Sequence, residues 1–421
     1  MARRGVLAAL GPGLLFSAAA VGVSHLVQST RAGADYGLAL LGLVVLANLV
    51  KYPAFRFGPH YAAATGTSLL EGYRRQGRGA LVIYGLATVG TMFTVQAAVT
   101  VVTAGLAIQA LGLPKAPVAV SAALLAGCGA LLALGRYKLL DGVAKALVAV
   151  LTVSTLAAAI IVLPRVDPST AFDLELVTGH PGAVFFLAAL VGWMPSAIDV
   201  AVWQSLWTLA RRAATGHTPT VRESMVDFHI GYIGTAALAL CFVVMGAGVL
   251  FGQPIQLSDS PAGFAGQIVQ MYEQTLGAWA GPLVGVAAFA VMLSTTLTVL
   301  DGFPRALVVL RARWRGPEVP GTDELESPDG RRAYFVAMLV LALGSVGVLL
   351  VLLTSLKALV DVATTLSFLT APVLAALNHR AIHAAEVPEE HRPGPALRVG
   401  SLVGVALQAI FALGYLVLRY G

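Results

Sequence analysis

Eleven apolar stretches, each about as long as a bilayer is thick, constrain this chain more than any other feature. A helix needs roughly 20 apolar residues to cross the hydrocarbon core. The stretches cover residues 8–30, 37–56, 79–111, 117–135, 142–163, 182–210, 229–251, 281–310, 333–354, 356–378 and 398–418. Charged residues make up only 11% of the 421 residues, too few to cover a soluble surface. We therefore expect an all-α polytopic membrane protein, with residues 1–421 forming one transmembrane domain in a lipid bilayer.

The basic residues sort onto one side when the spans alternate from a cytoplasmic N-terminus. Of the 27 Lys and Arg residues, 22 then fall on the inner side and five on the outer side. We expect the N-terminus in the cytoplasm, the C-terminus outside, and a location in the inner (plasma) membrane. The net charge of +6 does not indicate nucleic acid, because the basic residues are spread over short loops without interleaved aromatic residues.

Three features outside the apolar cores also carry predictions. Residues 61–76 are typical of an amphipathic helix on the cytoplasmic surface, with Leu69 and Leu70 facing lipid. Lys51, near the inner end of the second span, is expected to extend its amine toward the headgroups. Residues 311–332 are polar and are predicted to form a loop.

Two spans carry helix-breaking and polar residues at mid-membrane. These are Gly22, Ser24 and His25 in the first span and Gly192, Pro195, Ser196 and Asp199 in the sixth. Non-helical backbone at this depth is tolerated only where it is buried in protein or lines a cavity. Such interruptions at matching positions of two halves predict an inverted-repeat transporter. Repeat one then covers about 8–163, repeat two about 182–378, and an extra helix about 398–418.

Several short runs resemble the natural resistance-associated macrophage protein (NRAMP) family of transporters. They are GlyProGlyLeuLeu at 11–15, AlaGlyAlaAspTyrGly at 32–37, MetPro at 194–195 and SerThrThr at 294–296. The resemblance follows the order of the spans over essentially the whole chain. It implies the LeuT-type fold, with ten spans in two inverted repeats of five plus one more, and broken helices 1 and 6. It also implies import of manganese, iron or related divalent metals together with protons.

The chain departs from the family pattern at the metal-binding residues. Aligned from GlyProGly, the family's AspProGlyAsn motif falls on Gly22, Val23, Ser24 and His25, so that the metal-binding Asp is a glycine. The ligating Met is retained as Met194. The family's His after MetPro is Ser196, and its Asp and Glu of the proton route fall on Ala97 and Thr100. The resemblance therefore predicts altered selectivity and altered proton coupling.

His25, Met194 and Asp199 are the candidate metal ligands. His25 and Asp199 are polar groups at mid-membrane, where such groups are usually functional. A sulfur and an imidazole suit softer transition metals, and Asp199 supplies a replacement charge. The competing interpretations are a hydrogen-bonded core histidine, a packing methionine, and an ion pair between Asp199 and Arg31.

The substrate site is expected to include residues of both breaks and of the third span. The full set is Gly22, Val23, Ser24, His25, Val191, Trp193, Met194, Ser196, Asp199, Gln96 and Thr100. Thr295 and Thr296 of the eighth span form a candidate ion site, or else hydrogen-bond between helices.

Three functions remain open from the sequence. The first is a secondary transporter of a divalent metal with altered selectivity. The second is a sodium- or proton-coupled transporter of a small organic solute, which Trp193 and His25 would contact. The third is a non-transporting sensor with the same fold. No nucleophile elbow, zinc-protease motif or phosphate loop is present, so we expect neither an enzyme nor a bound cofactor. The sequence gives no indication of an oligomeric state.

Overall fold

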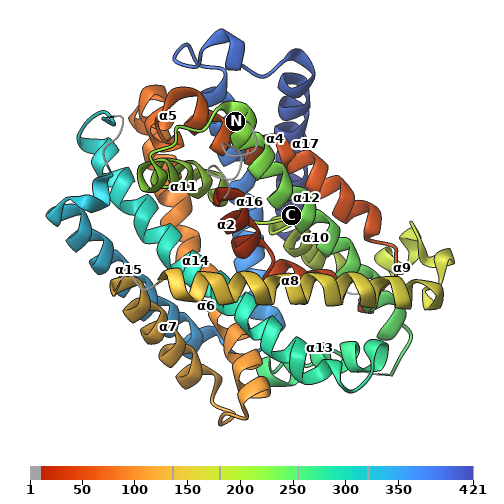
Figure 1. The fold of residues 1–421 in the computed structure, drawn as a ribbon. Helices are drawn as coiled ribbons and strands as arrows, with labels where there is room; N and C mark the ends of the chain where they lie inside the picture. The colour runs from red at the N-terminus through yellow and green to blue at the C-terminus, as the bar shows by residue number, and fades with distance from the viewer. Residues whose placement is uncertain (1–10, 135–136, 180–181, 255, 320–322, 421) are drawn as a thin grey trace.

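A computed structural model describes residues 11–134, 137–179, 182–254, 256–319 and 323–420, and the described residues form only helices and their connections (Figure 1). The longer helices are α2 (Pro12–Ala20), α4 (Leu41–Thr65), α5 (Leu69–Gln76), α6 (Arg78–Leu111), α7 (Pro117–Ala133), α8 (Tyr137–Val162), α10 (Ala183–Gly192), α11 (Asp199–Thr215), α12 (Val221–Val249), α13 (Pro261–Leu276), α14 (Ala280–Arg315), α15 (Pro328–Leu352), α16 (Leu356–Ile382) and α17 (Pro395–Tyr420). The shorter elements are the π-helix η1 (Ser24–Ser29), α3 (Thr30–Tyr36), α9 (Leu174–Thr178) and the 3-10 turns η2 (Leu163–Arg165), η3 (Pro168–Thr170), η4 (Glu324–Glu326) and η5 (Glu389–His391).

All eleven predicted spans coincide with helices or helix pairs, confirming a polytopic helical protein. Residues 8–10 of the first predicted span and residue 135 of the fourth lie outside the described residues. Within the described chain, seven helices are long and apolar enough to cross a membrane, and the bent pair at the N-terminus makes eight. The helices α7 and α10 are apolar but shorter.

The first span is broken between α2 and η1. Pro12 starts α2, where its missing N–H is not needed. The helix ends at Ala20 because Val21 leaves helical geometry, with ψ of 76°. The chain then bends by 46° before Ser24 begins one turn of π-helix that leads into α3. Such π-helical turns are frequently found at functional sites.

The sixth span is broken over a longer segment. The helix α10 ends at Gly192, α11 begins at Asp199, and the residues between them are not helical. Pro195 lacks an N–H group, so it cannot continue the helical hydrogen-bond ladder, and its peptide bond to Met194 is cis. The expected interruptions therefore occur in both spans.

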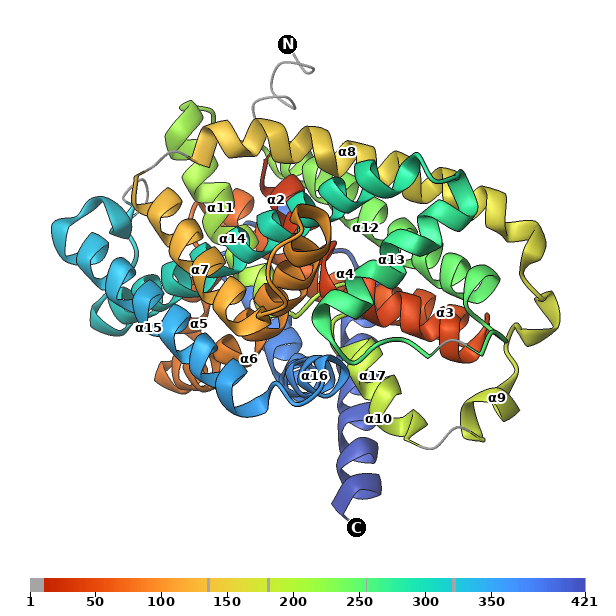
Figure 2. The same ribbon diagram turned by 90° about the horizontal axis from the view of Figure 1, so that it is seen from below.

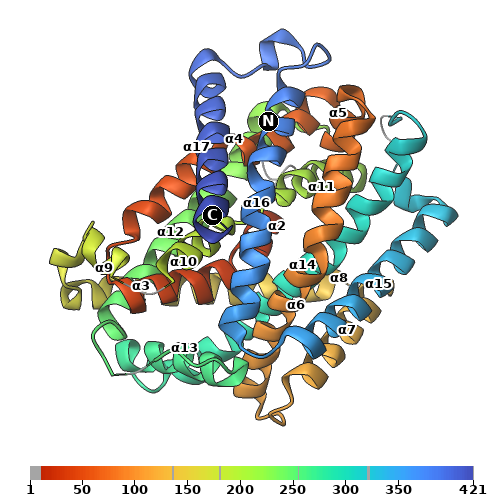
Figure 3. The same cartoon turned by 180° about the vertical axis from the view of Figure 1, so that it is seen from behind.

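Close contacts at two glycines bring the broken helices against their neighbours. A Cβ atom at Gly58 of α4 would lie 2.1 Å from the carbonyl oxygen of Ala201 in α11. A Cβ atom at Gly192 of α10 would lie 2.1 Å from the carbonyl oxygen of Thr364 in α16. Figure 3 shows α16 and α17 side by side, and Figure 2 shows the C-terminal end of α17 projecting beyond the other helices. The two glycine contacts show that the half-helices on either side of the second break pack closely against α4 and α16.

Residues 61–76 differ from the prediction. Residues 61–65 extend α4, and α5 packs against α6 and α16, so that Leu69 and Leu70 are fully buried in protein and do not face lipid. Glu71 of α5 accepts hydrogen bonds from Arg74 and from the backbone N–H of Glu318. Burial raises the pKa of Glu71, but these hydrogen bonds lower it and outweigh burial, so the net pKa lies below its usual value.

The predicted loop at 311–332 is shorter than expected. The helix α14 continues to Arg315 and α15 already starts at Pro328. The side chain of Arg313 is buried beside Glu71 and Glu324, and this pairing allows a charged residue to continue the helix.

Candidate functional site

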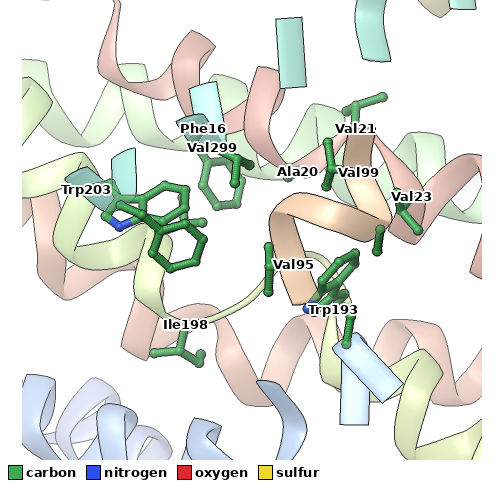
Figure 4. Close-up of a cluster of buried hydrophobic side chains, with 14 of the residues drawn as sticks. Phe16, Ala20, Val21, Val23, Val95, Val99, Trp193, Ile198, Trp203 and Val299 are labelled. Atoms are coloured by element: carbon green, nitrogen blue, oxygen red, sulfur yellow. The ribbon is translucent and has the colours of Figure 1, made fainter. Parts of the chain in front are cut away.

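A small cavity of about 30 Å³ lies between the two breaks. Its wall comes from α2 and η1, α6, the segment before α11, α11 itself and α14. The lining residues are Ala19, Ala20, Val23, Ser24, Val95, Val99, Trp193, Ser196, Ala197, Asp199, Val200, Trp203, Thr295, Val299 and Phe303. Figure 4 shows Trp193 and Trp203 on opposite sides of this region, with Val95 between them. A space of this size holds a water molecule or a single ion.

Among the described residues, Asp199 is the only carboxylate on the wall of this cavity. Asp199 is 3% exposed, and its Oδ1 atom has no hydrogen-bond partner in the part of the chain that the structure describes. Asp199 is also the first residue of α11, where the positive end of the helix dipole favours a negative charge. A buried carboxylate oxygen without a partner is costly unless a cation, a proton or water meets it. The geometry therefore places one unpaired carboxyl oxygen on the wall of the cavity.

Ser24 and His25 form a hydrogen-bonded group at the first break. The His25 ring is fully buried, with Nδ1 2.7 Å from the Ser24 hydroxyl and Nε2 2.9 Å from the carbonyl oxygen of Thr235. Since a carbonyl only accepts, Nε2 carries a proton. Ser24 Oγ also lies 2.7 Å from the Ala20 carbonyl oxygen and 3.3 Å from that of Pro195. Both ring nitrogens of His25 are thus occupied within the protein, and Ser24 connects the two breaks.

Lys51 does not extend toward the headgroups as predicted. Its side chain is 1% exposed, and Nζ donates hydrogen bonds to the carbonyl oxygens of Val191 at 2.5 Å and Gly192 at 2.8 Å. These carbonyls end α10 and carry the negative end of its dipole, which attracts a cation. The expected carbonyl ligand at Val191 therefore already accepts a hydrogen bond from the amine of Lys51.

Arg31 pairs with Asp361 rather than with Asp199. The distance from Arg31 Nη1 to Asp361 Oδ1 is 2.6 Å, and the guanidinium also lies over the Phe186 ring. Gln28 accepts a further hydrogen bond from Arg31. The interpretation of Asp199 as half of an ion pair with Arg31 is therefore wrong.

Only some of the other residues predicted at the two breaks line the cavity. Met194 is fully buried in an apolar cluster with Tyr36 and Phe186, and it is not among the lining residues. Gly22 packs against the Thr295 side chain. Trp193 does line the cavity, and its Nε1 donates to Ser367 of α16. Val23, Ser24, Trp193, Ser196, Asp199 and Thr295 are thus brought together, whereas Gly22, His25, Val191, Met194, Gln96, Thr100 and Thr296 are not on the wall.

The predicted polar residues of the third and eighth spans form hydrogen bonds within α6, between α6 and α14, and between α14 and α2. Gln96 Nε2 donates to Thr100 Oγ1 at 2.9 Å. Thr296 Oγ1 lies 2.8 Å from Thr103 Oγ1. Thr295 Oγ1 donates to the Ala18 carbonyl at 2.7 Å, which holds α14 against α2. The hydroxyls of Thr295 and Thr296 are therefore engaged in hydrogen bonds between helices, whereas that of Thr100 bonds within α6.

Two important residues were missed by sequence reasoning. Trp203 lies one turn after Asp199 on α11, and its ring packs edge-to-face on Phe303 at 4.8 Å, closing one side of the cavity. Lys51 was predicted only to extend toward the lipid headgroups, although an ionisable residue in a membrane span is a functional candidate by default. The spacing of i and i+4 from Asp199 to Trp203 would have indicated a shared helix face.

Comparisons with known proteins agree with this architecture. Residues 13–418 match the model of the natural resistance-associated macrophage protein-like family. An uncharacterized protein, PM0681, of Pasteurella multocida (strain Pm70) is 34% identical over 420 residues, covering 98% of this chain and 93% of that protein.

Solved structures show the same fold at low sequence identity. A mutant of the Eremococcus coleocola manganese transporter superposes with a TM-score of 0.72 at 14% identity, covering 97% of this chain and 86% of that chain. MhsT in complex with L-phenylalanine gives a TM-score of 0.64 at 16% identity, covering 97% of each chain. These likenesses show the LeuT-type fold. Together with the family match over residues 13–418, they establish that this chain belongs to the natural resistance-associated macrophage protein-like family of membrane transporters.

Proposed function

We propose that this protein is a secondary-active transporter of a divalent metal ion whose selectivity and proton coupling differ from the family pattern. The observation that carries the proposal is the buried, unpartnered Oδ1 of Asp199 on the wall of the cavity between the two breaks. The family motif places its carboxylate at the position of Gly22, whereas here the nearest anionic group follows the second break. The carboxylate of the cavity therefore comes from the second break in this protein and from the first break in the family pattern.

The cavity's chemistry supports a cation that prefers oxygen ligands. Asp199 provides a carboxylate, and Ser24 and Ser196 provide hydroxyls that line the same cavity. Met194 sulfur and the His25 ring are directed into packing and internal hydrogen bonds. Oxygen ligands suit Mg²⁺ and Mn²⁺ better than softer metals. Within the described residues no three His, Cys, Asp or Glu side chains are grouped to hold a metal, so the bound ion would retain water.

Lys51 supports coupling to protons rather than to sodium. In broken-helix transporters, half-helix carbonyls coordinate the coupling ion. Here the ammonium of Lys51 already occupies the carbonyls of Val191 and Gly192. The alternative ion site at Thr295 and Thr296 has its hydroxyls engaged in hydrogen bonds. We propose that Asp199, the ionisable group left facing the cavity, exchanges a proton for the metal.

We also propose a membrane topology and repeat boundaries for this chain. The sorting of basic residues supports a cytoplasmic N-terminus, an external C-terminus and a plasma-membrane location. The two breaks support repeats at about 8–163 and 182–378, with the last span, about 398–418, outside both repeats.

Calorimetry on the purified protein tests the function. Manganese, iron, zinc and magnesium would each be titrated into wild-type protein and into the Asp199→Asn variant, with Glu175→Gln on the exposed helix α9 as a charge-matched control. We expect manganese or magnesium to bind wild type and the control but not Asp199→Asn. The absence of metal binding at millimolar concentration would remove the proposal.

The same titration with small organic solutes examines the alternative substrate class. A cavity of about 30 Å³ favours an ion over an organic molecule. If an organic solute binds and no metal does, the protein would instead be a transporter of organic solutes. Trp193 and Trp203 would then contact the solute.

A further inference from the structure

A second, larger cavity lies far from the two breaks, at the end of α4. Its volume is about 460 Å³, within the range of small-ligand sites. It is an open cavity lined by the last turns of α4, the start of α12, the turn η5 and the start of α17. The lining residues are Arg56, His60, Val221, Glu390, His391, Arg392, Pro393, Gly394, Pro395, Ala396 and Leu397. Figures 1 and 3 show the segment between α16 and α17 at the same end of the molecule as α5. This end is cytoplasmic in the proposed topology.

His60 is the unusual residue of this cavity. His60 is 4% exposed, and neither Nδ1 nor Nε2 has a hydrogen-bond partner among the residues that the structure describes. The backbone of His391 lies near the ring but outside hydrogen-bond geometry. Buried polar atoms are nearly always paired in folded proteins, and each exception calls for an explanation such as a missing ligand.

Two guanidinium groups face the same cavity. Arg56 donates from Nη1 to the Tyr52 hydroxyl, while its buried Nε has no partner. Arg392 is anchored by hydrogen bonds to the carbonyls of Val387 and Ala385. Its contact with Glu389 at 3.7 Å is a largely exposed pair, which contributes little. The remaining carboxylate, Glu390, is exposed at the rim.

The N-terminus of α17 adds further donors. Gly394 precedes the helix and has no side chain to cap it, and Pro395 has no N–H group. The amides of Ala396 and Leu397 in the first turn therefore have no acceptor within the helix, and both residues line the cavity. A helix N-terminus of this kind attracts anions through its amides and its dipole.

We propose that this cavity binds a phosphate group, carried either by an anionic lipid headgroup or by a free cytosolic anion. Guanidinium forks, an imidazole and helix-terminal amides are the donors that recognise phosphate oxygens. A metal is not the expected ligand, because no group of three or more His, Cys, Asp or Glu among the described residues is arranged to hold one. The site is separate from the cavity between the breaks and does not depend on the transported substrate.

Thermal unfolding of purified protein in detergent tests the site, since a ligand that binds only the folded state raises Tm. The probes are inorganic phosphate against chloride at constant ionic strength, and micelles containing phosphatidylglycerol against micelles containing phosphatidylcholine. The variants are Arg56→Gln and the double variant Arg56→Gln with His60→Gln. Arg332→Gln, an exposed arginine at the start of α15, is the charge-matched control. His60 makes no hydrogen bond, so its replacement by Gln removes none.

The expected result is a rise in Tm for wild type and Arg332→Gln, with affinity at least about tenfold weaker in the double variant. A rise with phosphate identifies a free anion, and a rise with phosphatidylglycerol alone identifies a headgroup. Equal shifts in wild type and the double variant, or no shift in wild type with either probe, would overturn the proposal. Arg56→Gln alone tests the same point if the double variant does not fold.

Discussion

The two breaks occupy equivalent places in the fold but differ in how their polar groups are satisfied. At the first break, the Ser24 hydroxyl contacts Nδ1 of His25, and Nε2 of His25 donates to the carbonyl oxygen of Thr235. At the second, Lys51 donates to the carbonyls that end α10, while Asp199 Oδ1 at the start of α11 has no hydrogen-bond partner among the described residues. The first break is therefore a hydrogen-bonded scaffold, whereas the second places an unpaired carboxyl oxygen on the cavity wall.

Removing the charge at the second break should have the largest effect. Asp199→Asn keeps the shape of the side chain but loses a charge-assisted interaction worth about 3 kcal/mol, which corresponds to a fall of about 100-fold in transport. Metal uptake into proteoliposomes measures it, with Glu175→Gln as control. Uptake within a few-fold of wild type by a folded Asp199→Asn protein would mean that the second break does not carry the substrate charge.

Lys51→Met tests whether the end of α10 needs a cation. It removes two charge-assisted hydrogen bonds to buried carbonyls, and the free energy of unfolding should fall by about 2–4 kcal/mol. Denaturant unfolding in detergent measures this change, with Lys115→Met in an exposed loop as the matched control. If both variants unfold alike, the carbonyls of Val191 and Gly192 are satisfied in another way.

Glycine-to-alanine variants compare the packing of the two breaks directly. Gly192→Ala would place a Cβ atom 2.1 Å from a backbone oxygen and should destabilise by about 1–3 kcal/mol. Gly22→Ala meets the Thr295 methyl at 3.0 Å, where a small side-chain shift relieves the contact, so the loss should be under about 1 kcal/mol. The fall in Tm of each variant relative to wild type, measured by thermal unfolding, compares the two losses of stability. The reverse order would show that the first break is packed more tightly.

Two serine variants should give the smallest and most selective effects. Ser24→Ala removes the hydroxyl whose single proton bonds either the Ala20 carbonyl or His25 Nδ1, and it should lower the free energy of unfolding by about 1 kcal/mol. Ser196→Ala should leave stability nearly unchanged and weaken metal binding a few-fold, since a single neutral ligand is lost. Unfolding and calorimetry on both proteins separate these outcomes. A larger loss of metal affinity in Ser24→Ala than in Ser196→Ala would reverse the assignment of scaffold and site.

Sequence reasoning predicted the spans and the two interruptions because both are local. A bilayer requires long apolar segments, and Pro195 cannot donate a helical hydrogen bond wherever it lies in a fold. It also identified Asp199 as a functional candidate, because a carboxylate at mid-membrane is costly. It did not find the partner of Lys51 or that of Arg31, since neither Val191 nor Asp361 is near its partner in the chain.

The sequence by itself determined that the chain spans a bilayer, where its helices break, and which family it resembles. Only the tertiary structure decided which polar groups are already satisfied. His25 is hydrogen-bonded at both nitrogens, Met194 is packed among apolar side chains, and Asp199 Oδ1 is left without a partner. The reason is that helix breaks follow from short-range sterics and backbone hydrogen bonding, whereas the partner of a buried polar group depends on residues brought together by packing of distant helices.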